Sequence, residues 1–365
     1  MSINEIIIYI MVIFMALGAI DRIIGNRFGL GEKFEEGILA MGSLALSMIG
    51  IIVLAPVLAN LLRPVVVPLF NLVGADPAVF AGTILANDMG GASLAMELAQ
   101  TEEAGRFGGL IVGAMLGPTI VFTIPVALGI IKAEDRPALA RGVLAGIITI
   151  PIGSFVGGLV AGFPVLMVLR NLIPIVLIAI LIAVGLLLIP NGMVKGFQVF
   201  GKIIIIIITV GLAAAIIETL TGITIIPGMA TLDEGYLTVG GIAIVLAGAF
   251  PLVHAITVIF RKPLMKLGHL LGMNDKAAAG MVATLANNIP MFGMLHEMDE
   301  RGKVINVAFA VSAAFVFGDH LGFTAGFDDT MIFPMIVGKL VGGVTAVGVA
   351  MFLTRGEKHR GQSAD

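Results

Sequence analysis

The 365-residue sequence contains no cysteine, no tryptophan and only two tyrosines. Without cysteine, the chain cannot form disulfides, use a thiolate nucleophile or hold a thiolate-ligated metal. Charged residues are also scarce, at 12% of the chain, against about a quarter in soluble domains. The net charge of −3 gives no reason to expect a nucleic-acid partner. These shortages exclude several classes of protein and leave the apolar residues as the main source of information.

Apolar residues make up 58% of the chain, and the mean hydropathy is +1.10. A water-soluble fold of this size cannot bury so much apolar surface, so much of it must face lipid. The apolar run from Ile6 to Ile20 has no basic region before it and no cleavage pattern after it, which predicts a first spanning helix. No phosphate-binding loop, zinc-protease motif or nucleophile elbow occurs. The sequence therefore predicts an all-α polytopic membrane protein, a transporter rather than an enzyme, without a metal or cofactor.

Long apolar segments give the number of spanning helices, since each helix needs about 20 mostly apolar residues. Nine segments qualify, at about 5–24, 36–61, 107–131, 137–160, 170–190, 202–220, 238–260, 304–323 and 331–353. Two weaker segments are broken in the middle, 77–98 by Asn87-Asp88-Met89-Gly90-Gly91 and 276–297 by Asn287-Asn288-Ile289-Pro290. We therefore expect nine to eleven spanning helices, with the two broken segments as re-entrant or broken-helix hairpins.

The distribution of basic residues favours hairpins. If both broken segments enter and leave on one side, 17 of the 21 Lys and Arg residues face the same compartment. Three, Arg63, Arg106 and Arg170, face the other, and Lys339 lies within a span. The positive-inside rule makes the basic side cytoplasmic. The sequence therefore predicts an N-terminus outside and a cytoplasmic tail at 354–365.

The two broken segments also suggest an internal repeat. Leu85-Ala86-Asn87-Asp88 aligns with Leu285-Ala286-Asn287-Asn288 at an offset of 200 residues. This divides the chain into a first repeat (1–160) with hairpin 77–98, a connector (161–201) and a second repeat (202–353) with hairpin 276–297. Five crossings precede residue 202, so the second repeat is predicted to be inverted. Inverted repeats with broken helices near the midplane are typical of secondary transporters.

The breaks are the predicted solute site, because irregular backbone at membrane depth must be buried in protein or line a cavity. Free backbone groups and helix-dipole ends are available there, and an acid at this depth costs about 2.5–3.5 kcal/mol, which marks it as functional. The candidate substrate-binding residues are Asn87, Asp88, Thr119, Asn287, Asn288, Asp319 and His320. An alternative is that the Asn and Asp side chains only cap half-helices, and that His320 is a plain interfacial residue.

Longer stretches resemble the ethanolamine permease family of bacterial ethanolamine-utilisation systems. They are residues 34–37, 54–59, 82–91, 117–122, 124–130, 142–147 and 149–153. The resemblance extends over nearly the whole chain and implies uptake of ethanolamine across a bacterial inner membrane. It also implies that the carrier is needed most when acid keeps the amine protonated.

The residues at the breaks suit such a substrate, which near neutral pH is an ammonium with a hydroxyl on a two-carbon arm. Asp88 or Asp319 is predicted to bind the ammonium, and Asn87, Asn287 and Asn288 to complete the site. The lipid bilayer and this small molecule are the predicted partners. The alternative is an ion-coupled carrier of a small organic anion, held by backbone N–H groups and Asn amides on a similar scaffold.

Overall fold

The computed structural model describes residues 2–355, apart from the side chains at 190, 191, 260 and 264. Within these residues every regular element is helical. Eight helical stretches are long and apolar enough to cross a membrane: 3–23, 30–72, 102–130, 133–160, 165–188, 192–221, 232–259 and 329–353. Each matches a predicted span, which confirms an all-α, multi-pass membrane protein.

The predicted span at 304–323 is wrong as a continuous helix. The chain forms α15 (Glu300–Ala313), leaves the helical path, and resumes as α16 (Asp319–Phe327). Phe315 has a left-handed φ of 64°. The N–H groups of Phe315 and Phe317 donate instead to the carbonyls of Thr284 and Leu285. The backbone of this apolar segment therefore pairs with the hairpin beside it rather than with its own preceding turn.

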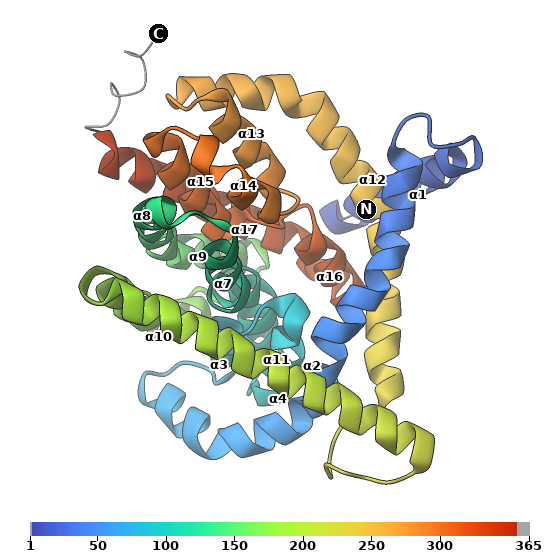
Figure 1. Cartoon of the computed structure of the whole chain (residues 1–365). Helices are drawn as coiled ribbons and strands as arrows, with labels where there is room; N and C mark the ends of the chain where they lie inside the picture. The colour runs from blue at the N-terminus through green and yellow to red at the C-terminus, as the bar shows by residue number, and fades with distance from the viewer. Residues whose placement is uncertain (1, 356–365) are drawn as a thin grey trace.

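The two broken segments form short helices, as predicted. The first contains α3 (Ala78–Ile84), η1 (Asn87–Met89) and α4 (Gly91–Leu98), and the second α13 (Asp275–Thr284), α14 (Ile289–Gly293) and η6 (Leu295–Glu297). Even the ten residues of α13 extend only about 15 Å, half the hydrocarbon thickness. In Figure 1, α3 and α4 lie toward the opposite end of the molecule from α13.

A polar side chain closes the base of each hairpin. The Asp76 carboxylate accepts hydrogen bonds from the N–H groups of Ala78 and Gln100, which joins the two ends of the first hairpin. In the second, the Asn274 side chain accepts from Ala277 N–H and donates to the carbonyl of Glu297. The short helices are therefore held in place at their outer ends while their broken tips point inward.

The other helices form two groups beside the hairpins. On one side of Figure 1, α1 (Ile3–Ile23) and the proline-containing α2 (Leu30–Leu72) pack with α12 (Leu232–Leu270). The second group contains the broken helices and their partners. Its elements are α5 (Glu102–Arg106), η2 (Phe107–Ile111), η3 (Val112–Ala114), α6 (Leu116–Pro118), η4 (Thr119–Thr123), α7 (Ile124–Ile130), η5 (Ala133–Asp135), α8 (Arg136–Ile147), α9 (Ile150–Val160), α15, α16, η7 (Asp329–Met331) and α17 (Ile332–Leu353).

Small residues hold the second group together. The α9 and α17 backbones meet at Gly153, where an added Cβ would lie 2.5 Å from the carbonyl oxygen of Gly338. A Cβ at Gly142 of α8 would lie 2.5 Å from the Val307 side chain of α15. Such close approach is typical of helix packing in membranes, where van der Waals contact replaces the hydrophobic effect. The helices α10 (Val165–Leu188) and α11 (Pro190–Thr221) complete the bundle, and α11 packs against α2.

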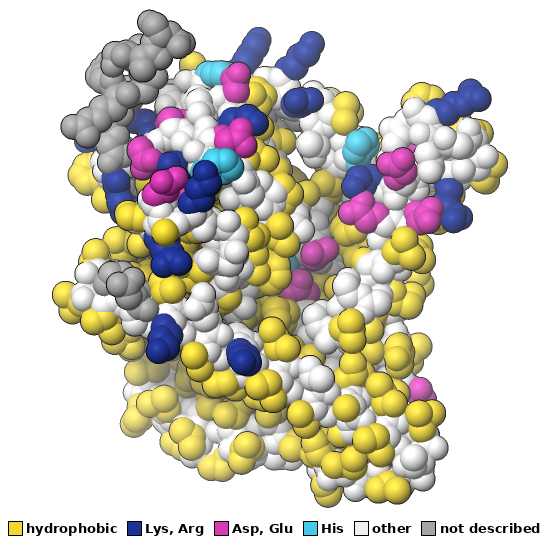
Figure 2. Space-filling model, viewed as in Figure 1, with side chains coloured by type: hydrophobic (Ala, Val, Ile, Leu, Met, Phe, Trp, Pro, Cys, Tyr) yellow, Lys and Arg dark blue, Asp and Glu magenta, His cyan; other side chains and the backbone are white. Residues whose placement is uncertain are grey.

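The order of elements in the first half recurs in the second at an offset of about 200 residues: a proline-containing long helix, a hairpin, a broken helix and a final span. Basic side chains gather at the end of the molecule where α13 lies, whereas the opposite end of the same face shows hydrophobic and uncharged groups with almost no charged side chain (Figures 1 and 2). The division into inverted repeats, the side occupied by each terminus and the connector role of 161–201 stay predictions. Most of the predicted tail lies outside the described residues.

Candidate functional site

A central cavity of about 270 Å³ lies between the tip of the first hairpin, the two broken helices and α2. The first hairpin contributes Ala86, Asp88 and Met89, and the broken helices contribute Pro118, Phe122, Phe315, Asp319 and His320. The remaining wall is formed by α2, which contributes Ser43, Leu44 and Ser47. The cavity therefore separates the hairpin-bearing group of helices from the group that contains α2.

Close backbone contacts hold the broken elements in place around the cavity. A Cβ at Gly117 would lie 1.9 Å from the carbonyl oxygen of Leu85, at the break of the first hairpin. A Cβ at Gly318 would lie 2.1 Å from the carbonyl oxygen of Ala286, at the break of the second. Only glycine permits either contact, so these positions determine how each hairpin tip meets its neighbouring broken helix.

Pro118 explains how a lysine is held behind the cavity. In a regular helix, the carbonyl of Ala114 would accept a hydrogen bond from the N–H of residue 118, but proline has no N–H. The Lys339 ammonium donates to this carbonyl. Lys339 lies in α17, is 1% exposed, and does not line the central cavity.

His320 lies between this lysine and the first hairpin. Its Nδ1 is 2.9 Å from Lys339 Nζ, and its Nε2 is 3.9 Å from Asp88 Oδ2. The imidazole packs on the ring of Phe315, with centroids 5.2 Å apart, and Phe315 makes an edge-to-face contact with Phe122. His320 is thus a buried residue within the site, not an interfacial one, although its predicted contact with substrate is untested.

A second cavity, of about 200 Å³, shares Asp319 with the first. Its other walls include Asn287 of the second hairpin and Gly318 between α15 and α16. Phe250 and His254 of α12 and the Lys33–Glu36 ion pair of α2 complete it. Figure 2 shows a hollow in the middle of this face with acidic side chains inside it. The two cavities therefore place half-buried carboxylates along a path from the basic end of the molecule to the first hairpin.

The four other predicted residues lie nearby, with different surroundings. The side chain of Asn87 is fully buried, and its amide has no hydrogen-bond partner among the described residues. Asn287 accepts from Ile289 N–H, a capping bond of the kind the alternative interpretation predicts, while also lining the second cavity. Asn288 is buried and donates to Thr123 Oγ1 at 3.0 Å. Neither Asn87 nor Asn288 lines either cavity.

Thr119 connects the two broken helices. Its hydroxyl lies 2.7 Å from the carbonyl oxygen of Met115 and 3.0 Å from that of Val311 in α15. The Val311 carbonyl is available as an acceptor because the N–H of Phe315, four residues on, donates to Thr284 instead. In this structure the hydroxyl is therefore occupied by backbone acceptors, and a direct role in binding substrate stays a prediction.

Two polar residues of the central cavity were missed by sequence reasoning. Ser43 and Ser47 lie one turn apart on α2 and line the central cavity. Both hydroxyls donate to carbonyls of their own helix, which leaves their oxygen lone pairs available as acceptors. The signal was a pair of serines at i and i+4 in an otherwise apolar span.

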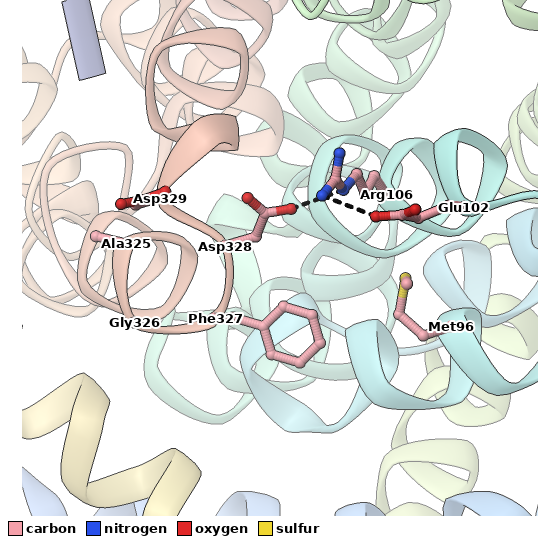
Figure 3. Close-up of a pocket in the computed structure, with 8 residues that line it drawn as sticks. All are labelled: Met96, Glu102, Arg106, Ala325, Gly326, Phe327, Asp328 and Asp329. Carbon is pink, nitrogen blue, oxygen red and sulfur yellow. Dashed lines mark ion pairs between the residues drawn. The ribbon is translucent and has the colours of Figure 1, made fainter. Parts of the chain in front are cut away.

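A third cavity, of about 570 Å³, opens at the other end of the hairpin-bearing group. Figure 3 shows Arg106 of α5 reaching across it to Asp328, with Glu102 as a second partner. The Arg106 Nε–Asp328 Oδ2 distance is 2.8 Å, and the Asp328 side chain is 14% exposed. This ion pair joins the helix that follows the first hairpin to the C-terminal end of α16.

Comparison with known proteins gives a consistent result. Over residues 3–353 the chain matches the family described as "Ethanolamine utilisation protein, EutH". A Listeria monocytogenes protein named "Probable ethanolamine permease EutH" is 69% identical, covering 97% of this chain and 95% of the relative. The Escherichia coli K12 protein of the same name is 54% identical over 97% of this chain and 96% of its own, and the "Uncharacterized protein YxeR" of Bacillus subtilis is 51% identical over 99% and 98%. No solved structure matches.

Broken helices around cavities, inside a bundle of apolar spanning helices, define a multi-pass membrane protein of the permease class. The chain belongs to the ethanolamine utilisation protein EutH family. This confirms the family resemblance seen in the sequence and the interpretation as a transporter rather than an enzyme.

Proposed function

We propose that the protein imports ethanolamine across a bacterial inner membrane as the ammonium cation. Relatives that are 54–69% identical over nearly the whole chain are named "Probable ethanolamine permease EutH", which supports this substrate. The proposed binding site is the central cavity, with Asp88 and Asp319 as the partners of the ammonium. Asn87, Asn287 and Asn288 are proposed to complete the site, with Asn287 also capping the backbone at Ile289 N–H.

The observation that carries the proposal is the charge of the cavity wall. Asp88 and Asp319 both line it, and no lysine or arginine of the described chain does so. Two carboxylates that face one cavity in a poorly solvated environment repel each other, and a cation between them relieves this repulsion. A small organic anion, the alternative substrate, would meet both carboxylates directly, so this wall disfavours it.

The size and chemistry of the cavity also suit an amino alcohol. A volume of 270 Å³ corresponds to roughly nine water molecules at about 30 Å³ each, enough for a solute of four heavy atoms with some water. Phe122 and Phe315 offer ring faces to the ammonium and apolar contact to the two methylene groups. Ser43 and Ser47 can accept a hydrogen bond from the substrate hydroxyl.

Transport is proposed to proceed by alternating access between two inverted repeats, with the hairpin tips at the site. The central cavity adjoins a second cavity that reaches the basic end, and the Arg106–Asp328 ion pair spans the other end. These features support a conformation closed toward the outside, with the N-terminus outside and the C-terminus cytoplasmic. Because the chain has no cysteine, single cysteines can test the orientation. A membrane-impermeant thiol reagent should label Thr224→Cys in intact cells but not Glu134→Cys, and the reverse pattern would refute the orientation.

The membrane potential alone can drive such uptake. A monovalent cation gains about 2.3 kcal/mol in moving down 100 mV. At about 1.4 kcal/mol per tenfold, this supports roughly 40- to 50-fold accumulation. A uniporter is therefore sufficient, and no second ion is needed to explain import.

Substitution of the two acids tests the proposed site. Asp88→Asn and Asp319→Asn should each weaken ethanolamine binding about ten- to 150-fold, since a charged hydrogen bond contributes about 1.5–3 kcal/mol. Binding would be measured on purified protein, with Glu97→Gln as the control because Glu97 is an exposed acid of the same hairpin. Unchanged affinity in both acid variants would show that ethanolamine binds elsewhere. Competition by organic anions, but not by amines, would favour the anion carrier.

A further inference from the structure

We propose that Lys339 is a fixed internal cation that sets the number of charges moved with each substrate molecule. The inference rests on the proposed function, because it concerns the same central cavity. Lys339 does not reach the cavity itself and acts through His320, so it is a positioning residue.

The surroundings of Lys339 fit a charged ammonium. Its Nζ is buried and lies within hydrogen-bond distance of two groups, the carbonyl oxygen of Ala114 and Nδ1 of His320; an ammonium donates to both. The carbonyl is available because Pro118 has no N–H to give it. On the other side of His320, the Asp88 carboxylate lies 3.9 Å from Nε2, so an acidic group stands at the far end of this contact. A buried cation is tolerated where it has such partners and an opposite charge nearby.

His320 transmits this arrangement to the cavity. An imidazole that accepts at Nδ1 carries its proton on Nε2, and Nε2 is the atom that faces Asp88. The lysine therefore fixes His320 as a neutral ring that presents an N–H toward the carboxylate. Asp88, His320 and Lys339 form one line from the cavity into the protein.

The net charge of the empty site, counted over Asp88, Asp319, His320 and Lys339, is −1. Asp88 and Asp319 contribute two negative charges, Lys339 one positive charge, and neutral His320 none. Glu36 of α2 faces Asp319 across the second cavity, but its charge is balanced by its ion pair with Lys33. The other neighbours of Lys339 and His320 that the structure records are uncharged: the backbone carbonyl of Ala114 and the ring of Phe315.

Binding of one organic monocation therefore brings the net charge of the site to zero. A neutral loaded site and a singly charged empty site predict one charge per substrate and no coupling ion. Replacing Lys339 by glutamine makes the empty site −2 and the loaded site −1. An uncompensated buried charge is costly, so we expect the variant to take up one proton on Asp88 or Asp319 together with the substrate. Two charges would then move for each ethanolamine.

Reversal potentials in proteoliposomes measure this ratio directly. With a tenfold ethanolamine gradient and equal pH on both sides, the current through wild-type protein should reverse at about 59 mV, the value for one charge per substrate. Lys339→Gln should reverse at about 30 mV, the value for two charges, and should respond to a pH gradient. A purely structural role for Lys339 would lower the current without moving the reversal potential.

Matched variants separate the possible outcomes. Lys276→Gln removes an exposed lysine that pairs with Glu297 and should keep the wild-type value. If Lys339→Gln does not fold, Lys339→Met is measured in its place. In protein that retains Lys339, Asp319→Asn brings the net charge of the empty site to zero. Substrate should then expel a proton from Lys339, leaving no net current, while uptake persists at ethanolamine concentrations raised to offset the weaker binding of this variant.

A wild-type potential of zero or of 30 mV overturns the inference, as does Lys339→Gln at 59 mV with no response to pH. If neither lysine variant folds, uptake without net current in Asp319→Asn supports it, and a 59 mV potential there overturns it. Absence of any ethanolamine uptake by the wild type would instead refute the proposed function, which the same vesicles report separately.

Discussion

Gly117 lies so close to the carbonyl oxygen of Leu85 that an added Cβ would be 1.9 Å from it. The same relationship joins Gly318 to Ala286, 201 residues later in each case. In both halves of the chain a glycine of a broken helix therefore contacts the backbone at the break of a hairpin. The contact fixes the distance between the hairpin tip and the cavity wall.

We expect Gly117→Ala and Gly318→Ala to impair both folding and uptake. The backbone oxygen that the new methyl group would meet cannot rotate away, and overpacking of this kind costs about 1–3 kcal/mol. Melting temperatures in detergent would show the loss. The control is Gly129→Ala in α7, where nothing lies within 4 Å and the melting temperature should be unchanged or higher. Equal stability of all three variants would refute the close contacts.

The sequence predicted the helical, multi-pass fold and both hairpins because lipid restricts the backbone and breaks in apolar segments are easy to see. It failed at 314–317, where Ala314-Phe315-Val316-Phe317 is wholly apolar and has no local helix breaker. That break depends on hydrogen bonds to Thr284 and Leu285, which are tertiary contacts. The sequence also identified Asp88, Asp319 and His320 as candidates, yet gave no sign that Pro118 frees a carbonyl for Lys339. Such a partnership depends on two segments more than 200 residues apart.

Pro118→Ala should weaken the support of Lys339. The new N–H can donate to the Ala114 carbonyl, so the lysine must compete with a regular helical hydrogen bond for this acceptor. A hydrogen bond to a charged group contributes about 1.5–3 kcal/mol, so we expect uptake to fall at least about tenfold. Initial rates of labelled ethanolamine uptake would measure the effect. Pro125→Ala in α7, a proline that does not line the cavity, is the control and should retain most activity.

The Arg106–Asp328 ion pair is expected to hold the outer end closed. Arg106→Gln removes it, and exposed or half-exposed pairs contribute about 0.2–1 kcal/mol, so opening should increase by up to about fivefold. Ala325 lines the same cavity, and Ala325→Cys would be the single thiol of the chain. Labelling by an impermeant reagent should therefore be faster in the Arg106→Gln background. A slower or equal rate would show that the pair does not restrain this end.

Asp76 predicts a pH dependence of stability outside the spanning helices. Burial raises the pKa of Asp76 above 3.8, although hydrogen bonds from the Ala78 and Gln100 N–H groups partly oppose this. The unfolded chain therefore releases this proton at lower pH than the folded protein does. Stability falls as pH rises from 3.8 through the raised pKa, and the loss is complete above it. Melting curves of wild type against Asp76→Asn should diverge in this interval, and parallel curves would contradict it.

The most direct measurement is uptake of labelled ethanolamine by cells that lack a carrier of their own, at pH near 5.5. Uptake should saturate, and it should fall when the membrane potential is collapsed, because the ammonium form carries its charge inward. Asp88→Asn would be measured alongside and should lose saturable uptake at low substrate concentration. Saturable uptake that is indifferent to the potential would contradict carriage of the cation. No uptake above that of the empty vector would remove ethanolamine as the substrate.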